Sequence, residues 1–398
     1  MNILILLDKY QKDAGASVAA RAYIKQYEEY KFGHAYLYTT STAKDDEEME
    51  GHIFNLYDDL HKIILGYDID VVHYFHSSRS PIRRSLLYTA RKVLKKIPRF
   101  IPIVTTVCQR PSNKLTVLTI GDIRLSDHVV FIDNAAYNDA LYGFIPKNRK
   151  SRIYFGGTLE GFKMTGELAS KKKSNVPKFV YGRGSSLSKC PHDILEVFDK
   201  INVPNKVYQI AGVAKDSWLG RKAEGRNDVS IIPPVPFYEW WEICNQFDVF
   251  LYYLPEDAHS SIDGTLGDAM LMKIPPIVYG ADAPKERIIQ GVNGFVANTK
   301  EEIVKYAELL YHDDELRKRM GEEARKSQIE MFSFENTLNQ YQTIYKMLID
   351  NGKRDCLLKI PLKSKYKVFK QKYLFAYWRQ LFRAINTKII QRSPLRFH

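Results

Sequence analysis

The sequence is poor in cysteine. Its four cysteines are Cys108, Cys190, Cys244 and Cys356, and no two of them have the C-x-x-C spacing. Disulfide frameworks and zinc sites both need cysteines, or cysteines with histidines, at short regular spacings. The sequence therefore predicts neither, and scattered cysteines are typical of a protein that works in a reducing compartment.

Long hydrophobic runs are missing as well. The apolar start of the chain, residues 2–7, is followed at once by Asp8 and Lys9, so it is too short for a signal peptide and is interpreted as a first buried strand. No stretch approaches the roughly 18 uninterrupted apolar residues that a membrane-spanning helix needs. We therefore expect a soluble, cytoplasmic protein.

Acidic residues are almost absent from one segment. The chain has 59 Lys and Arg against 46 Asp and Glu, a net charge of +13. Residues 352–398 hold 13 of these basic residues and a single acid, Asp355, so the rest of the chain is nearly neutral. A nucleic-acid-binding protein usually carries its basic surface on the folded domain. Nucleic acid is therefore not an expected partner, and the tail is expected to have a role of its own.

Short apolar runs alternate with longer helical patterns along most of the chain. This alternation is typical of β-α-β units around a parallel sheet, and a polar, strand-poor stretch separates two such series. We predict an α/β protein with an N-terminal domain at 1–160, a linker at 161–177, a second domain at 178–330, a closing helix at 331–351 and a basic tail at 352–398. Because ligands of open α/β sheets bind at the carboxyl ends of the strands, the site is expected between the two domains.

The expected strands and crossover helices follow from these patterns. Strands are predicted at 2–7, 35–38, 71–74, 103–107, 129–132, 178–181, 207–211, 229–232, 249–252 and 276–279. Helices are predicted at 18–30, 85–96, 193–200, 238–245 and 301–311.

A glycine-rich turn directly follows the strand predicted at 178–181. It begins Gly182-Arg183-Gly184 and reaches Lys189 before the next helix. Glycine allows close approach of the backbone, and two cations at the carboxyl end of a strand can pair with a diphosphate. The spacing is not that of a P-loop, and a solvated turn with two surface cations is the alternative.

A second candidate runs from the strand predicted at 249–252 into a helix. The amides at the start of that helix, with the hydroxyls of Ser260 and Ser261, can hold an anion. Asp268, about one turn into the helix, can accept hydrogen bonds from ribose hydroxyls.

Taken in order, these motifs resemble the family-4 glycosyltransferases, or glycosyl transferases group 1, which have the GT-B fold of two Rossmann-like domains facing each other across a cleft. The resemblance covers roughly residues 2–348, a length over which chance matches become improbable. In the second domain it rests on 180–183 with Lys189, 210–212, 247–252, 267–270, 274–278 and 286–294. In the first domain it rests more weakly on Gly15, 33–34, 70–73, 101–106 and 126–132.

The resemblance implies a nucleotide-sugar donor held mainly by the second domain and an acceptor held mainly by the first. Its implied catalytic residues are Arg183 and Lys189, which would hold the diphosphate. The implied donor-binding residues are Gly15, Gly182, Val235, Pro236, His259, Ser260, Ser261, Asp263, Asp268 and Glu286. The candidates on the acceptor side are His76, Cys108 and Gln109.

Two positions depart from the family pattern. The family has Glu-x7-Glu, whereas here Ser260 stands first and Asp268 second, with His259 as an alternative shifted by one residue. Cys108 and Gln109 stand where a histidine often follows the fourth strand. No Asp-x-Asp metal motif is present, so we expect cations of the chain to stabilise the leaving phosphate and expect no metal and no cofactor.

Together these implications predict a metal-independent, retaining glycosyltransferase of the hexosyltransferase type. It would move a sugar to a cell-surface glycan or a lipid-linked precursor. Two alternatives follow from the departures: a catalytically impaired nucleotide-sugar-binding scaffold or partner subunit, and a GT-B-like nucleotide-sugar epimerase. No particular oligomeric state is predicted.

The tail at 352–398 has an amphipathic pattern. Basic residues lie on one face, and apolar residues recur at helical spacing on another: Leu374, Trp378, Leu381, Ile385 and Ile389. A basic amphipathic helix with aromatic residues is typical of an interfacial membrane anchor. We therefore expect peripheral binding to an anionic membrane surface, on the inner face of the cell membrane, with packing against a protein partner as the alternative.

Overall fold

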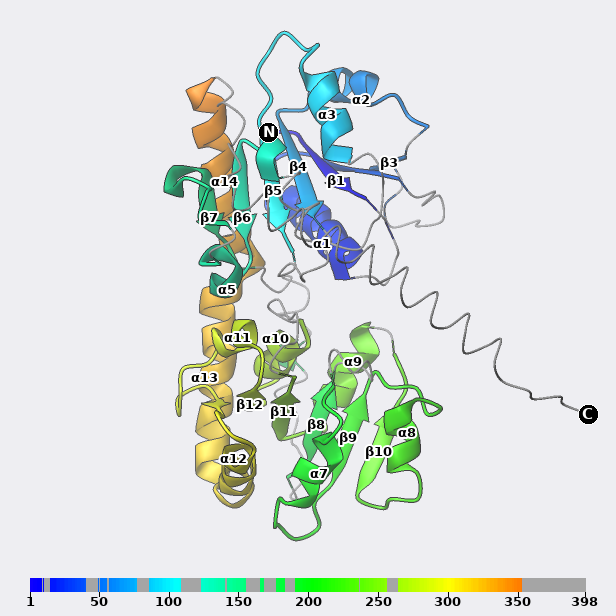
Figure 1. Ribbon diagram of the computed structural model, residues 1–398, viewed down its shortest axis with the longest axis vertical. Helices are drawn as coiled ribbons and strands as arrows, with labels where there is room; N and C mark the ends of the chain where they lie inside the picture. Colours follow the sequence, from blue (N-terminus) through cyan, green and yellow to red (C-terminus); the bar gives the residue numbers. More distant parts are fainter. Residues whose placement is uncertain are drawn as a thin grey trace, which may run out of the picture.

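The computed structural model consists of two α/β domains joined by long C-terminal helices (Figure 1). The residues that it describes are 1–8, 10, 15–40, 49, 51–55, 57–76, 86–108, 123–139, 142–154, 165–167, 177–182, 190–235, 237–255 and 264–352.

The first domain is built on a seven-stranded sheet with the order β3-β2-β1-β4-β5-β6-β7. Every neighbouring pair is parallel. Its strands are β1 (Ile3–Leu7), β2 (Ala35–Thr39), β3 (Ile53–Asn55), β4 (Val71–His76), β5 (Ile103–Val107), β6 (His128–Phe131) and β7 (Lys150–Arg152). Its helices are α1 (Gly15–Glu29), α2 (Leu60–Gly66), α3 (Leu86–Leu94) and α5 (Asn134–Tyr137). The continuous apolar run of β1 is buried along its whole length, as expected for a central parallel strand covered on both faces.

The second domain is built on a six-stranded sheet with the order β10-β9-β8-β11-β12-β13, again parallel throughout. Its strands are β8 (Phe179–Gly182), β9 (Tyr208–Ala211), β10 (Val229–Ile232), β11 (Val249–Tyr253), β12 (Pro276–Tyr279) and β13 (Phe295–Val296). Its helices are α7 (Ile194–Asp199), α8 (Trp218–Ala223), α9 (Phe237–Cys244), α10 (Gly264–Leu271), α11 (Asp282–Lys285) and α12 (Lys300–His312).

These two parallel-sheet units confirm the predicted α/β fold class. Each strand predicted from the sequence is present, with ends shifted by at most two residues. Strands β3, β7 and β13 were not predicted, because two or three residues are too few to show a periodic pattern.

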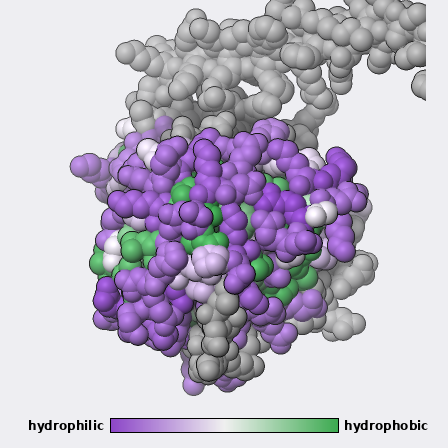
Figure 2. Space-filling view, turned by 90° about the horizontal axis from the view of Figure 1, so that it is seen from below, coloured by the Kyte–Doolittle hydropathy of each residue, from purple (hydrophilic) through white to green (hydrophobic). Residues whose placement is uncertain are grey.

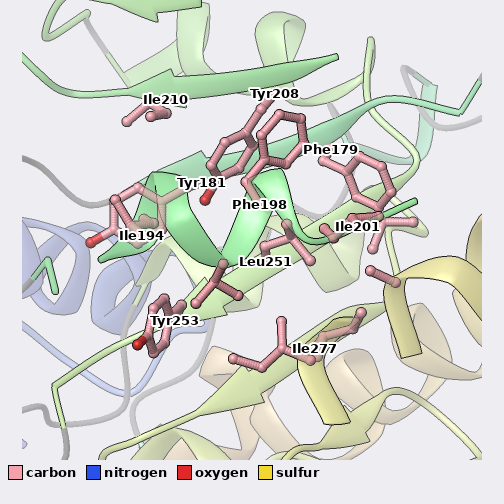
Figure 3. Close-up of a cluster of buried hydrophobic side chains, with 14 of the residues drawn as sticks. Phe179, Tyr181, Ile194, Phe198, Ile201, Tyr208, Ile210, Leu251, Tyr253 and Ile277 are labelled. Carbon is pink, nitrogen blue, oxygen red and sulfur yellow. The ribbon is translucent and has the colours of Figure 1, made fainter. Parts of the chain in front are cut away.

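Aromatic packing holds α7 against the second sheet. Figure 3 shows the rings of Phe179, Phe198 and Tyr208 grouped together between the helix and the strands. The rings of Phe198 and Tyr208 are stacked with their centroids 4.6 Å apart. This packing joins the last turn of α7 to the amino ends of β8 and β9, while at the other end of the helix the Tyr253 hydroxyl donates to Asp193 over 2.7 Å.

Two long helices return the chain from the second domain to the first. Helix α13 (Asp314–Phe332) packs against α10, and α14 (Phe334–Asn351) packs against the first domain. Ser333 separates them with an extended backbone, and its hydroxyl caps α14 by accepting from the Asn336 amide. In Figure 1 the yellow-to-orange helices run along one side of both domains.

The surface at the free end of the second domain is mostly hydrophilic. Figure 2 views this end from below and shows hydrophobic residues only in patches between polar ones. Among the residues that the structure describes, no helix is both long enough and apolar enough to cross a bilayer.

Candidate functional site

The two domains touch where a strand of each sheet ends. Helix α5 follows the carboxyl end of β6, and α11 follows the carboxyl end of β12, and these two helices are neighbours (Figure 1). The carboxyl ends of both sheets therefore lie toward the same junction. This is the location that the sequence predicted for the site.

Glu286 bridges this junction. Its carboxylate oxygens accept the Asn134 amide at 2.9 Å each and the Ala135 amide at 3.1 Å. The Tyr154 hydroxyl donates to the same carboxylate at 2.9 Å. Burial and the neighbouring Glu286 raise the pKa of Tyr154 to about 12, so the phenol stays protonated and donates. The carboxylate thus sits on the exposed amides at the start of α5, where negative charge is favoured.

The sequence predicted Glu286 as a donor ligand, but the structure places its carboxylate on the first domain. No spacing in the sequence pointed to this contact, because its partners lie about 150 residues earlier in the chain. A contact of Glu286 with a donor stays a prediction.

In the second domain, Gly182 ends β8 against an indole ring. A Cβ atom at this position would lie 2.5 Å from a ring carbon of Trp240. The glycine is therefore required by the packing of α9 against the strand, whatever else approaches it. The predicted role of Gly182 in donor binding stays a prediction.

Asp268 lies inside this part of the second domain, in α10. It is only 6% exposed, and its Oδ2 has no hydrogen bond of normal geometry with the described residues. Burial raises the pKa of the Asp268 carboxyl to about 7, and the nearby indole N–H groups of Trp241 and Trp240 and the Arg287 guanidinium only partly offset this. A ribose hydroxyl donating to Oδ2 would supply the missing hydrogen bond.

Arg287 connects the surroundings of Asp268 to the domain junction. Its Nη1 donates to the Gln328 side chain at 2.6 Å, and its guanidinium lies 4.3 Å from the centroid of the Phe332 ring. The Phe332 ring also packs on the Tyr154 ring, with centroids 4.8 Å apart. The surroundings of Asp268 and the bridge at Glu286 are therefore connected through packed side chains.

In the first domain, where the acceptor is predicted to bind, three polar residues lie together at the carboxyl ends of β1 and β4. The Tyr74 hydroxyl donates to Asp8 Oδ2 at 2.6 Å, and His76 Nδ1 lies 3.4 Å from the same hydroxyl. The sequence pointed to His76 as a candidate on the acceptor side but not to Asp8. The only signal for Asp8 was an acid directly after a buried strand, which by itself is not specific.

Cys108 follows the carboxyl end of β5, next to the end of β4. Its thiol donates to the Thr106 carbonyl over 3.7 Å, and burial raises the pKa of the thiol to about 12. The sulfur is therefore a neutral thiol at physiological pH, not a nucleophilic thiolate. Its predicted place on the acceptor side stays a prediction.

Several predicted residues lie outside the residues that the structure describes. They are Arg183, Lys189, Pro236, His259, Ser260, Ser261, Asp263 and Gln109, together with the tail beyond Gly352. Of the others, Gly15 begins α1, and Val235 packs against the cluster that contains Trp240 and Trp241. Within the described ranges, no group of three or more His, Cys, Asp or Glu side chains is placed to hold a metal ion.

Comparison with known proteins links part of the chain to a family. Residues 168–327 match the family model described as glycosyl transferases group 1. A curated relative, an uncharacterised glycosyltransferase of Methanocaldococcus jannaschii, is 24% identical over 261 residues. That match covers 60% of this chain and 64% of the relative, so it spans less than two thirds of the relative's length.

Solved structures match nearly the whole described body. A glycosyltransferase from Rickettsia africae superposes with a TM-score of 0.69 at 16% identity, over 88% of this chain and 99% of that one. The Anabaena protein HepE in complex with UDP gives 0.67 at 15% identity, over 88% and 100%. A lipopolysaccharide outer core galactosyltransferase gives 0.63 at 12% identity, over 87% and 100%. These matches confirm the predicted GT-B architecture.

Proposed function

We propose that this protein is a glycosyltransferase that uses a nucleotide-sugar donor, because residues 168–327 match the family model described as glycosyl transferases group 1. The observation that carries the proposal is Asp268. It is a buried carboxylate with one oxygen lacking a hydrogen bond of normal geometry, at the position where the family motif has its second acid. A bound donor would supply the hydrogen-bond donor that this oxygen lacks.

The donor is a nucleoside-diphosphate sugar held by the second domain. Arg183 and Lys189, directly after β8, hold the diphosphate, and Asp268 holds the ribose. UDP-sugars are the first class to test, because the Anabaena protein of the same fold was solved with UDP and with UDP-glucose. Support for this assignment comes from the positions of Gly182 and Asp268 near the carboxyl edge of the second sheet.

The acceptor is a glycan or a lipid-linked precursor held by the first domain. The residues that would meet it are His76, Cys108 and Gln109, with Asp8 as an addition from the structure. The basic tail at 352–398 brings the protein to an anionic membrane surface, where a lipid-linked acceptor would be found. Deleting the tail should abolish sedimentation with anionic liposomes yet spare transfer to a soluble acceptor analogue. Unchanged binding to liposomes after the deletion would reject this part of the proposal.

The transfer is retaining and needs no metal. The acceptor oxygen forms its bond to the anomeric carbon on the face that the leaving phosphate vacates, and that phosphate takes the acceptor proton. The main task of the protein is then to stabilise the charge that develops on the phosphate, which Arg183 and Lys189 can do.

The test is incubation of the full chain with a panel of labelled nucleotide sugars, with and without a membrane extract as acceptor source. Release of the nucleotide and transfer of label to the extract, both dependent on the extract, are the expected results. Conversion of the donor without any acceptor would indicate the epimerase instead. Tight donor binding with neither outcome would indicate the scaffold, which the Ser260 departure from the family motif favours.

A further inference from the structure

The joint between the two domains is built around one carboxylate. Glu286 lies just after α11 in the second domain, and its three hydrogen-bond donors, Asn134, Ala135 and Tyr154, all belong to the first. Two are backbone amides at the start of α5, whose third amide, that of Ala136, is capped by Asp133 at 2.6 Å. Each donor group at this end of α5 is therefore matched to an acceptor, across the junction or within the first domain.

The joint lies beside a place where the chain crosses between the domains. The ring of Tyr154 packs on Phe332, the last residue of α13, and the Thr337 hydroxyl of α14 donates to the Tyr154 carbonyl at 2.7 Å. Tyr154 is therefore held both by the helix pair α13–α14 and by Glu286. Contacts at this point therefore determine the position of one domain relative to the other.

We propose that Glu286 is a positioning residue: it fixes the position of the second domain relative to the first and so aligns the donor with the acceptor. This inference rests on the proposed function, in which the two substrates are held by different domains. With substrates divided in this way, a small shift of one domain changes the distance between the reacting atoms, and a misplacement of about 1 Å can cost on the order of 100-fold in rate.

The Glu286→Gln variant, in which an amide replaces the carboxylate, is expected to lose part of the contacts across the domain junction. A glutamine can accept from both backbone amides with its single oxygen, but its NH2 group then faces the Tyr154 hydroxyl. That hydroxyl now donates to the carboxylate and already accepts from the Asn134 side chain over 3.3 Å and from Arg152, so only part of the contacts can form. Loss of charge also removes the favourable interaction with the start of α5. Glu286→Gln is therefore a nearly isosteric probe of the joint.

The experiment compares Glu286→Gln, Glu286→Ala and Tyr154→Phe with the unchanged chain. Asp282→Asn is the matched control, because Asp282 is an exposed carboxylate on α11 that pairs with Lys285 over 3.5 Å. We expect kcat to fall about 10- to 100-fold in the two Glu286 variants and less in Tyr154→Phe, with the Kd of UDP unchanged throughout. A raised Kd with unchanged kcat would assign Glu286 to the donor site and overturn the proposal, and so would an unchanged kcat in Glu286→Ala.

A second measurement does not depend on activity. Fluorescent labels on exposed sites of the two domains report their separation in solution, and the two Glu286 variants should show a shifted or broadened distance distribution that Asp282→Asn does not show. If the unchanged chain transfers no sugar, the proposed function fails, while the distance measurement still decides whether Glu286 seats the domains. An unchanged distribution in Glu286→Ala would overturn the positioning role whatever the activity.

Discussion

Two buried polar clusters in this protein, one in each domain, differ in how completely their hydrogen bonds are made. In the first domain, His73 Nε2 lies 2.8 Å from the Thr106 hydroxyl, and the Tyr345 hydroxyl lies 2.6 Å from His73 Nδ1. The hydrogen-bond network continues from the Thr106 hydroxyl to the Tyr341 hydroxyl and from the Tyr345 hydroxyl to the Tyr23 hydroxyl, each over 2.8 Å. Each of these polar side chains is hydrogen-bonded, so the cluster is a structural link that ties α14 to β4, β5 and α1.

In the second domain the cluster around Asp268 is incomplete. Asp268 Oδ2, Trp240 Nε1 and Arg287 Nε have no hydrogen bond of normal geometry with the described residues. Leaving such groups unpaired costs free energy on the order of 1–3 kcal/mol each, so a folded protein tolerates them where a ligand completes the set. The first cluster is therefore a complete structural link, whereas the open hydrogen-bonding groups of the second are what the proposed donor would complete.

The largest expected effect concerns the cations of the second domain. Arg183→Ala should lower turnover about 100-fold or more, because it removes a group that stabilises charge on the leaving phosphate. Lys189→Ala should act similarly, and both variants should keep the unfolding temperature of the unchanged chain. Steady-state kinetics with a nucleotide sugar check this, with Arg319→Ala on the exposed side of α13 as control. Near-normal transfer by either variant would remove that residue from the site.

The next largest expected effect is a loss of stability when the hydrogen-bonded cluster of the first domain is broken. Tyr345→Phe leaves the buried ring nitrogen of His73 and the Tyr23 hydroxyl without their shared partner. The free energy of unfolding should fall by about 1–3 kcal/mol, while kcat measured below the melting temperature stays the same. Denaturant unfolding is the measurement, and Tyr57→Phe, at a side chain that is 87% exposed, is the control. A loss of turnover without a loss of stability would move this cluster into the functional site.

The two clusters should also make the free energy of unfolding depend on pH in different ways, through Asp268 in the second domain and His73 in the first. The folded pKa of Asp268, about 7, lies above its ordinary value of 3.8, so the folded state binds the extra proton between these values. The stability contributed by the protonated carboxyl is therefore full below about pH 4 and is lost as the pH rises through 7. Asp268→Asn should flatten this decline and stabilise the protein at pH 8 by on the order of a few kcal/mol.

Burial lowers the pKa of His73 to about 3. The free energy of unfolding therefore changes with pH in the opposite direction at this residue. The unfolded state binds the proton more readily, so stability is lost as the pH falls below about 6.5. Unfolding curves between pH 4 and pH 8 measure both slopes, with the exposed Asp350→Asn as control. An Asp268→Asn curve parallel to that of the unchanged chain would contradict the burial of an uncompensated carboxyl.

The smallest expected effect is that of a chelator. If Arg183 and Lys189 take the part of a divalent cation, transfer should persist in excess EDTA. Loss of activity that magnesium or manganese restores would show that the donor site has been assigned wrongly.

Much of the fold followed from local patterns in the sequence. Strands such as β1 and β11 are continuous apolar runs, and the parallel sheet follows from their alternation with helices. The sequence also placed Gly182 directly after a strand, of which it is the last residue in the structure, and Asp268 in a helix, as the structure has it. These features are encoded within about ten neighbouring residues, and for that reason they could be predicted.

The contacts between distant segments could not be predicted in this way. Glu286 meets Asn134 across the domain junction, and no local pattern in either segment encodes the other. Trp240 and Trp241 were interpreted as packing residues, which their burial supports, but their position beside Asp268 depends on how α9 and α10 are set against each other. The hydrogen bond from the Tyr74 hydroxyl to Asp8 likewise joins two segments that are far apart in the chain, so the local sequence around Asp8 does not predict it.

The most direct test of the central claim compares turnover of a nucleotide sugar by the unchanged chain, Asp268→Asn and Tyr345→Phe, with unfolding measured on the same samples. We predict that Asp268→Asn folds normally and loses about tenfold or more in kcat/KM, because the donor loses a charged hydrogen-bond acceptor. We predict that Tyr345→Phe is less stable and keeps its kcat/KM. Equal kcat/KM for Asp268→Asn and the unchanged chain would contradict the claim that the incomplete cluster of the second domain is the donor site.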